Sequence, residues 1–281
     1  MQLEFYKIQG AGNDFIFIDN RDDKFKENDP LFVKHLCKSH TGIGSDGLLL
    51  LEDSQFADFK MRYFNSDGYE SEMCANGSRC TCYMAYLLGI IDKKHSFEAG
   101  DGVHSGEIID TEKVSVEVIL KKETKLLTFP VDFELPNSIS FIDFLNTGVP
   151  HLILECEDID LVPVDDIGKA LRFHRYFMPE GTNVNFVEKK ETNNSIELKV
   201  RTFERGVDAE TLSCGSGVTA AAISFYKRLK PKSKNIYITT RGGYLVVTLS
   251  DDFESIYLEG PVKIIFKGTY IEEEGFKWYA H

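Results

Sequence analysis

The chain has 281 residues, of which 42 % are hydrophobic, and its 45 acidic and 32 Lys and Arg residues give a net charge of −13. An acidic chain repels nucleic acids and anionic membrane surfaces, because both bind through clustered positive charge, so we expect neither as a partner. The length predicts one large domain or two small ones.

Short strands and two helices alternate in the first part of the chain. A helix is predicted to begin at Pro30, after the capping residue Asp29, and to run to about His40. A second, buried helix is predicted at 75–88 and ends at Gly89. Strands are predicted at 3–8, 15–19, 47–51, 59–64, 95–98, 102–109 and 113–120.

The second part of the chain begins with a segment that has no clear period. From about residue 126 to 145 the pattern is loose, with Pro130 and Pro136, and we place a domain joint near residue 120. After it, helices are predicted at 164–176 and 215–229, and strands at 183–188, 195–203, 235–240, 243–250 and 255–259.

An internal repeat is the clearest sign of how the chain is organised. Two segments, near 62–86 and 201–226, share the pattern Arg-x-Phe, a turn, Glu-(Ser/Thr)-x-x-Cys-x-x-Gly and an apolar helix that ends in Tyr. The pattern aligns Arg62 with Arg201, Glu70 with Glu210, Cys74 with Cys214 and Gly77 with Gly217. Two similar domains are therefore predicted, each with a cysteine at the start of its central helix.

A cysteine at a helix N-terminus has a lowered pKa, because the helix dipole and the free N–H groups favour the thiolate. If both helix starts face one cleft, their N–H groups can bind a carboxylate. Cys74 and Cys214 can then invert the α-carbon of an amino acid, since one group removes a proton from one face and the other delivers a proton to the opposite face. The other cysteines are expected to be buried thiols without disulfides: Cys37, Cys80, Cys82 and Cys156.

Two other features of the sequence point to other kinds of function. The Gly-x-Gly-x-x-Gly run at 42–47 precedes an apolar strand and not a helix, so we do not expect it to bind a nucleotide. A thiol redox or metal-binding protein that uses Cys74, Cys80, Cys82 and Cys214 stays open as an alternative, although the cysteine spacing matches no zinc motif and we expect no metal.

Several blocks of the sequence resemble the diaminopimelate epimerase family, and they occur in the family's order over nearly the whole chain. The blocks are 12–15, 64–68, 73–80, 204–206 and 210–217. The resemblance implies an α/β (α+β) fold of two pseudo-symmetric domains, each a β-barrel-like mixed sheet around a central helix, with the site between them. It places the domains at 1–119 plus 262–281 and at 120–261, because the last strand returns to the first domain.

The resemblance also implies a role for each site residue. Cys74 and Cys214 match the two acid/base residues of a reaction that interconverts LL- and meso-diaminopimelate without a cofactor, for lysine and peptidoglycan synthesis. Substrate binding is implied for Asn13, Asn65, Asn183, Glu204 and Arg205, and for the helix starts Ala75, Asn76, Gly215 and Ser216. His151 and Glu204 match groups that tune the cysteines.

Six cysteines in a long chain without a secretory signal predict a cytoplasmic protein. The family resemblance further implies a homodimer that acts on a small amino-acid substrate. The chain departs from the family's pattern at Gly47, Ala75 and Val149, and Asn146 or Asn185 could replace the contact missing at 149. Because these departures concern the fit of the substrate, a racemase of another amino acid, such as histidine, remains the alternative within the same fold.

Overall fold

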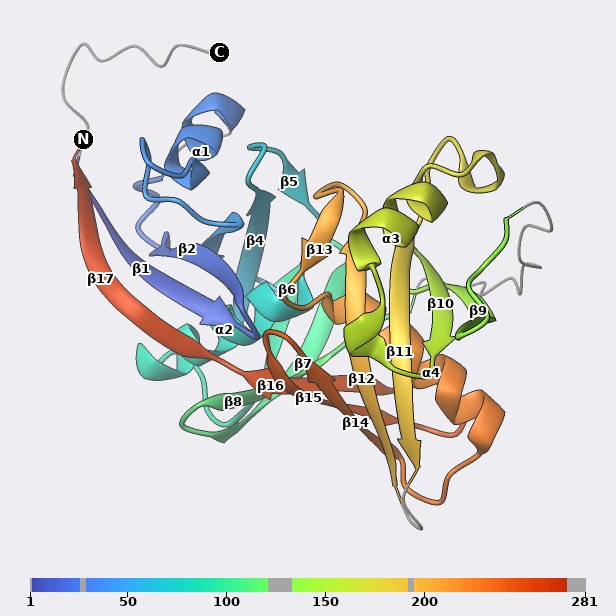
Figure 1. Cartoon of the computed structure of the whole chain (residues 1–281). Coiled ribbons are helices and arrows are strands. Elements are labelled where there is room, and N and C mark those ends of the chain that lie inside the picture. Colours follow the sequence, from blue (N-terminus) through green and yellow to red (C-terminus); the bar gives the residue numbers. More distant parts are fainter. Residues whose placement is uncertain (1, 26–28, 121–132, 192–194, 272–281) are drawn as a thin grey trace. The chain divides into compact units, whose positions relative to one another are not determined.

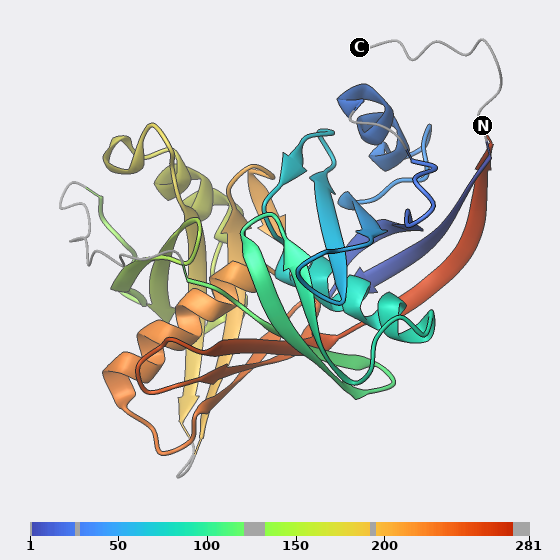
Figure 2. The ribbon, with the colours of Figure 1, turned by 180° about the vertical axis from the view of Figure 1, so that it is seen from behind.

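The computed structural model describes residues 2–25, 29–120, 133–191 and 195–271 (Figures 1 and 2). The chain forms two compact units. Unit 1 comprises residues 1–117 together with 260–281, and unit 2 comprises residues 118–259. Of the predicted loose segment 126–145, residues 126–132 lie outside the described part.

Unit 1 is built on one mixed sheet. Its strands are β1 (Gln2–Gly10), β2 (Asn13–Asp19), β3 (Gly47–Glu52), β4 (Phe59–Asn65), β5 (Glu70–Ser71), β6 (Lys94–Ala99), β7 (Gly102–Asp110), β8 (Lys113–Glu117) and β17 (Lys263–Ile271). The order across the sheet is β17-β1-β2-β3-β4-β6-β7-β8, and β5 pairs with β4. The pairs β2–β3 and β4–β6 are parallel and the others are antiparallel.

The central helix of unit 1, α2 (Ala75–Leu87), packs against this sheet. Its apolar side includes Cys80, Cys82 and Met84, which lie in one core cluster with side chains of the strands. The helix ends before Gly89, whose φ of 71° is readily adopted only by glycine, as its sequence predicts. A second cluster lies between the sheet and α1 (Pro30–Cys37).

The helix α1 is shorter at its C-terminus than the predicted range to His40. Asp29 caps its start as expected, through a bond of 2.9 Å from the Leu31 N–H to Oδ1. At the other end, the Leu36 carbonyl accepts from the backbone N–H groups of Ile43 and Gly44. The following loop therefore takes an acceptor that the next helical turn needs, and Lys38 is already extended.

Unit 2 repeats the architecture of unit 1. Its strands are β9 (Ile139–Asn146), β10 (Pro150–Cys156), β11 (Asn183–Glu191), β12 (Ile196–Glu204), β13 (Ala209–Thr211), β14 (Asn235–Thr240), β15 (Gly243–Leu249) and β16 (Ile256–Pro261). The order is β9-β10-β11-β12-β14-β15-β16, with β13 on β12. Its pairs β10–β11 and β12–β14 are parallel, in the same places as β2–β3 and β4–β6. The α+β fold and the predicted duplication are confirmed.

The helices of unit 2 are α3 (Val164–Arg172) and α4 (Gly215–Leu229), with 3-10 turns at Ile159–Leu161 and Arg175–Phe177. The helix α4 (orange in Figures 1 and 2) packs against β9, β10, β11 and β12. One prediction was wrong: the helix predicted at 164–176 ends at Arg172, and His174 is extended. The segment with the loose pattern contains β9, which was not predicted and is stabilised by its pairing with β10.

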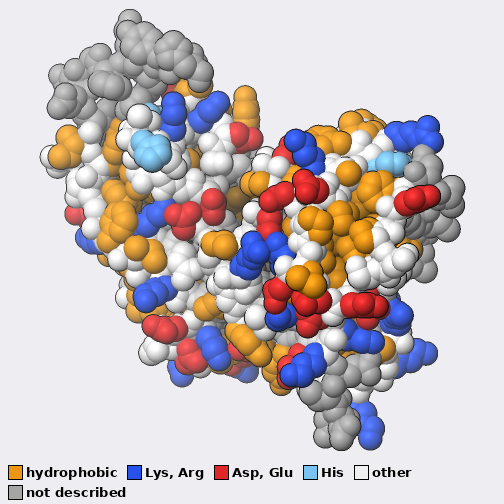
Figure 3. Space-filling model, in the orientation of Figure 1, with side chains coloured by type: hydrophobic (Ala, Val, Ile, Leu, Met, Phe, Trp, Pro, Cys, Tyr) orange, Lys and Arg blue, Asp and Glu red, His pale blue; other side chains and the backbone are white. Residues whose placement is uncertain are grey.

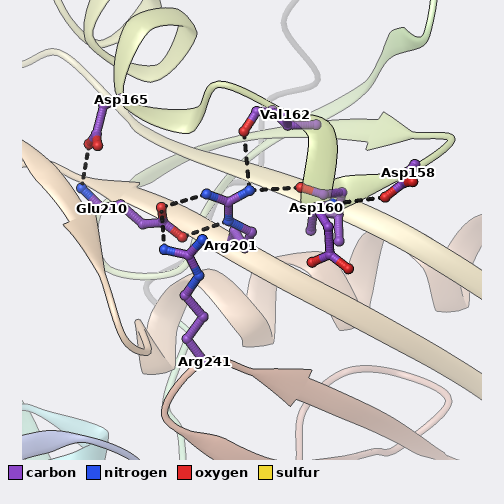
Figure 4. A network of polar contacts seen from close by, with 8 residues as sticks. Asp158, Asp160, Val162, Asp165, Arg201, Glu210 and Arg241 are labelled. Carbon is purple, nitrogen blue, oxygen red and sulfur yellow. Dashed lines mark hydrogen bonds and ion pairs between the residues drawn. The ribbon is translucent and has the colours of Figure 1, made fainter.

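A paired arginine and glutamate occupies the same place in both units. In unit 2, Arg201 on β12 donates from Nε and Nη2 to the two carboxylate oxygens of Glu210 on β13, each at 2.7 Å (Figure 4). Arg241 adds a bond of 2.9 Å to Glu210. In unit 1, Arg62 makes the corresponding bidentate contact with Glu70, at 2.9 and 2.8 Å. Each ion pair links the short strand before the cysteine, β5 or β13, to the neighbouring strand, β4 or β12.

The surface carries charges of both signs. On the face shown in Figure 3, Lys and Arg side chains are interspersed with Asp and Glu side chains among the described residues of both units. Within the described ranges, no helix is long and apolar enough to cross a membrane.

Candidate active site

Cys74 is the N-cap of α2, as predicted. Its backbone is extended (φ −132°, ψ 115°), and its Sγ accepts from the Gly77 N–H at 3.5 Å. Sγ also lies 3.7 Å from Oδ1 of Asn13, which stands at the start of β2. The thiol therefore meets both a helix N-terminus and a side-chain amide of the same unit.

Cys214 is the N-cap of α4, with a similar extended backbone (φ −111°, ψ 109°). Its Sγ lies 3.5 Å from Oγ of Ser216. The glycine three residues later is required sterically: a Cβ at Gly217 would lie 2.3 Å from Oδ1 of the buried Asn185. At the matching Gly77, a Cβ would lie 2.9 Å from a methyl group of Leu49. Both helix starts are thus packed closely against their sheets.

The first helical positions after each cysteine are Ala75 and Asn76 in α2, and Gly215 and Ser216 in α4. Backbone N–H groups in the first turn of a helix have no partner within the helix, so such a turn can bind an anion. Each unit therefore has one cysteine at the N-cap of its central helix, and binding of an anion by the first turn stays a prediction.

The three candidate asparagines lie in different surroundings. Asn13 is beside Cys74, and its Oδ1 also accepts from Asn76 at 3.3 Å. Asn65 accepts from the hydroxyl of Tyr63 at 2.7 Å. Asn183 is buried and bonds to the backbone at both ends of its amide, donating to the Pro150 carbonyl at 3.0 Å and accepting from the Arg205 N–H at 2.8 Å. Asn183 therefore holds the backbone of Arg205 in place.

Glu204 and Arg205 stand at the end of β12. One oxygen of Glu204 accepts from the Thr211 hydroxyl on β13 at 2.8 Å. Arg205 donates from Nη1 to the Glu180 carbonyl at 3.3 Å. The turn continues through Gly206, whose φ is 95°. Unit 2 thus carries a carboxylate and a guanidinium at consecutive positions, at the end of β12 and the start of the turn that leads to β13.

His151 on β10 is fully buried, and its surroundings fix its tautomer. Asn185 donates from Nδ2 to the Leu152 carbonyl at 3.1 Å and lies 3.2 Å from Nδ1 of His151, while its Oδ1 accepts from Thr202 at 2.9 Å. A carbonyl only accepts, so the amide nitrogen faces both partners and Nδ1 of His151 is an acceptor. The proton is therefore on Nε2, which has no hydrogen-bond partner within the described part of the chain.

Burial lowers the pKa of His151 to about 3, and the charge of Arg205 acts in the same direction. The imidazole is therefore neutral near pH 7. A neutral imidazole with its proton on Nε2 can donate a hydrogen bond, but it adds no positive charge to unit 2.

His151 should make folding stability depend on pH. In the unfolded chain its pKa returns to the ordinary value of 6.5, so between about pH 3 and 6.5 the unfolded state binds one more proton than the folded state. Acidification in this range therefore destabilises the native protein. We expect His151→Gln to flatten the fall of the unfolding free energy by up to about 1.4 kcal/mol per pH unit. Urea unfolding of both proteins at about pH 7 and about pH 4.5 measures this, and parallel pH profiles would contradict it.

The remaining cysteines are buried and free, as predicted: Cys37, Cys80, Cys82 and Cys156. Burial raises the pKa of Cys37 to about 11 and that of Cys156 to about 12, and it also raises the pKa of Cys80 and Cys82. These thiols are therefore protonated near pH 7. Among the described residues, no three His, Cys, Asp or Glu side chains are grouped so that they could hold a metal ion.

The sequence did not predict the residues that contact the candidate site residues without being candidates themselves. Asn185, named only as a substitute for the contact missing at Val149, is fully buried and faces His151. Asn146 accepts from the Gly148 N–H and so closes its own turn. Arg79 and Asp46 were not considered, and both reach the Cys74 surroundings through asparagine side chains. A fully buried arginine on a helix is a signal that only the structure reveals.

Comparison with known proteins identifies relatives along nearly the whole chain. The family model described as diaminopimelate epimerase matches residues 5–120 and 144–265. Diaminopimelate epimerase from Aquifex aeolicus is 42 % identical over 282 residues, covering 96 % of this chain and 99 % of the relative. The enzyme of the same name from Flavobacterium psychrophilum is 38 % identical, covering 95 % and 100 %.

Solved structures extend the similarity of the fold. A PhzF-family phenazine biosynthesis protein from Bacillus anthracis has a TM-score of 0.73 at 15 % identity, covering 97 % of this chain and 100 % of that one. A probable proline racemase from Agrobacterium radiobacter has a TM-score of 0.68 at 14 % identity, covering 97 % and 94 %. At such low identity these matches show a shared fold.

Proposed function

Because the chain belongs to the diaminopimelate epimerase family, we propose that it is an isomerase that interconverts LL- and meso-2,6-diaminopimelate without pyridoxal phosphate or another cofactor. The observation that carries this proposal is the duplicated half-site, with Cys74 and Cys214 each at the N-cap of the central helix of its unit. One thiol per unit is what a two-base inversion of a single carbon requires.

In the proposed reaction, the thiolate of one cysteine removes the α-proton from one face of the substrate. The thiol of the other cysteine then delivers its proton to the opposite face, so the two sulfurs exchange protonation states and the reverse reaction restores them. The helix-start N–H groups at Ala75, Asn76, Gly215 and Ser216 bind the α-carboxylate and stabilise the charge that develops on it.

The other candidate residues bind the substrate or support the site. Arg205 pairs with the distal carboxylate, because a guanidinium binds a carboxylate in a bidentate manner. Glu204 pairs with an ammonium group and tunes a thiol. Asn13, Asn65 and Asn183 complete the binding set, and His151 acts as a neutral N–H donor. We further propose that residues 1–119 with 262–281, and residues 120–261, act as the two domains of the enzyme.

We place this activity in lysine and peptidoglycan precursor synthesis, in a cytoplasmic homodimer. These assignments rest on the relatives, which carry one name and match over at least 95 % of this chain in the two cases described above.

The test of the proposed function uses reduced protein and LL-diaminopimelate, with the products resolved by chiral chromatography. We expect the meso isomer at a rate that a chelator does not change. Parallel reactions with L-histidine and L-proline distinguish the substrate: turnover of one of these, and none of diaminopimelate, would keep the mechanism but overturn the substrate. Loss of activity on chelation would overturn the metal-independent mechanism.

A further inference from the structure

Arg79 is an unusual buried residue on α2. Its side chain is fully buried, yet its hydrogen-bond acceptors are neutral: Nη2 donates to Oδ1 of Asn76 at 2.6 Å, and Nη1 donates to the Ala75 carbonyl at 3.2 Å. Its Nε has no partner among the described residues. A buried cation normally pairs with an anion, because the loss of hydration is costly.

The contacts continue through two side-chain amides to a carboxylate. Asn76 donates from Nδ2 to Oδ1 of Asn13 at 3.3 Å, and Asn13 donates from Nδ2 to Oδ2 of Asp46 at 2.6 Å. The same oxygen of Asp46 accepts from the Asp14 N–H at 3.1 Å, so it is an acceptor for two donors. Asp46 lies at the exposed end of this chain of contacts, and Asp14 is paired with Lys7.

We call the chain of contacts Arg79–Asn76–Asn13–Asp46 the relay. Its two ends determine which way the oxygen and the nitrogen of each side-chain amide point. A guanidinium only donates, so the amide oxygen of Asn76 must face Arg79 and its nitrogen must face Asn13. At the other end, Asp46 accepts, so the nitrogen of Asn13 faces it. The oxygen of Asn13 is then left to face the Sγ of Cys74, at 3.7 Å.

We propose that Arg79 and Asp46 are positioning residues that fix the donor and acceptor directions of Asn76 and Asn13 beside Cys74. The relay keeps the side-chain oxygen of Asn13, and not its N–H, facing the thiol of Cys74. It also holds both amides in a single orientation when the substrate binds. This inference rests on the proposed function, and it adds Arg79 and Asp46 to the residues that the proposed mechanism uses.

Unit 2 lacks this arrangement at the matching positions. There the internal repeat aligns Ser216 with Asn76 and Thr219 with Arg79. Thr219 donates to the Gly215 carbonyl at 2.9 Å, as Arg79 does to the Ala75 carbonyl at 3.2 Å, but it carries no charge. The relay is therefore a feature of the Cys74 half-site, and Thr219 provides a matched control position.

The first test is a double-mutant cycle with Arg79→Met and Asp46→Ala. Each single change should lower kcat/KM about tenfold or more, mainly through KM, since each frees the same two amides. The double variant should be no worse than the poorer single variant, because both changes break one relay. Fold losses that multiply in the double variant would overturn the proposal. Arg79→Lys, which keeps a buried donor and is the milder change to the core, should retain more activity than Arg79→Met.

A second measurement does not depend on the substrate. Iodoacetamide is added to each variant, and the alkylation rates of Cys74 and Cys214 are compared by peptide mass spectrometry. A simple charge effect would slow the alkylation of Cys74 in Arg79→Met and speed it in Asp46→Ala. The relay predicts that both variants react about threefold faster or more, because Asn13 can then turn its N–H toward the sulfur and stabilise the thiolate.

Cys214 should be unaffected in both relay variants, and Thr219→Val should leave the rate of Cys74 unchanged. Opposite shifts in the two relay variants would overturn the relay, even if the protein proves inactive on diaminopimelate. Conversely, parallel shifts in an inactive protein would keep the relay and reject only the proposed substrate.

Discussion

Replacement of either Cys74 or Cys214 by Ala should lower kcat for epimerisation by roughly 10³-fold or more, near the upper part of the range for a single acid or base group. Each variant lacks the group that serves one face of the substrate, so neither direction of the reaction can be completed. Both variants should remain folded, because the Cys74 thiol makes only a long cap bond of 3.5 Å to the Gly77 N–H and the Cys214 side chain makes no cap bond. Steady-state rates in both directions measure the effect.

Cys156→Ala is the matched control for the cysteine variants. Its thiol is buried on β10 among apolar side chains, and burial raises its pKa to about 12. We expect its kcat to stay within about twofold of the parent, since a protonated core thiol takes no part in proton transfer. Activity in Cys74→Ala or Cys214→Ala that equals this control would remove the basis of the two-base mechanism.

The largest effect on stability is expected from Arg201→Met. Arg201 and Glu210 are only 10 % and 9 % exposed, and Arg201 also donates to the Ile159 carbonyl at 2.7 Å (Figure 4). Its removal leaves the buried Glu210 carboxylate with Arg241 as its remaining arginine partner in the network of Figure 4. Breaking a buried ion pair from one side costs roughly 3 kcal/mol. Urea unfolding should show a loss of this size.

Arg62→Met in unit 1 is the control for that change. Arg62 makes the same bidentate contact and a longer one of 3.3 Å to Glu52, but its bidentate partner Glu70 is 46 % exposed, so water can replace the bonds lost there. Exposed pairs contribute only about 1 kcal/mol or less, and the loss should be correspondingly small. Equal losses of unfolding free energy in the two variants would show that burial does not determine how much these ion pairs stabilise the fold.

The duplicated core of the fold is the part that follows most directly from the sequence. The starts of α2 and α4 were predictable, because Cys74 and Cys214 precede small residues and an apolar run in the same frame. The strand β9 was not, since its residues have a loose pattern and gain their structure by pairing with β10. Pairing between segments outweighs local preference there.

The site shows the same division between local and distant contacts. The position of the two cysteines at helix starts could be predicted from the repeated pattern, because each copy of the repeat is one continuous segment of the chain. The relay could not, because Asp46 and Asn13 are 33 residues apart in sequence and Asn13 and Asn76 are 63 apart. Single polar residues such as these are typical of turns and helix surfaces, and only the folded chain of unit 1 brings them together.

The most direct test of the two-cysteine mechanism is the early incorporation of deuterium from heavy water. Reduced protein is mixed with LL-diaminopimelate in heavy water, and the isomers are separated and their α-hydrogen content measured by mass spectrometry before equilibrium. The mechanism predicts that the meso product carries deuterium at the inverted carbon while the recovered LL substrate keeps its protium, because a different thiol delivers the new hydrogen. Deuterium in the recovered substrate at the rate of product formation would instead indicate one base acting on one face, and would contradict the account.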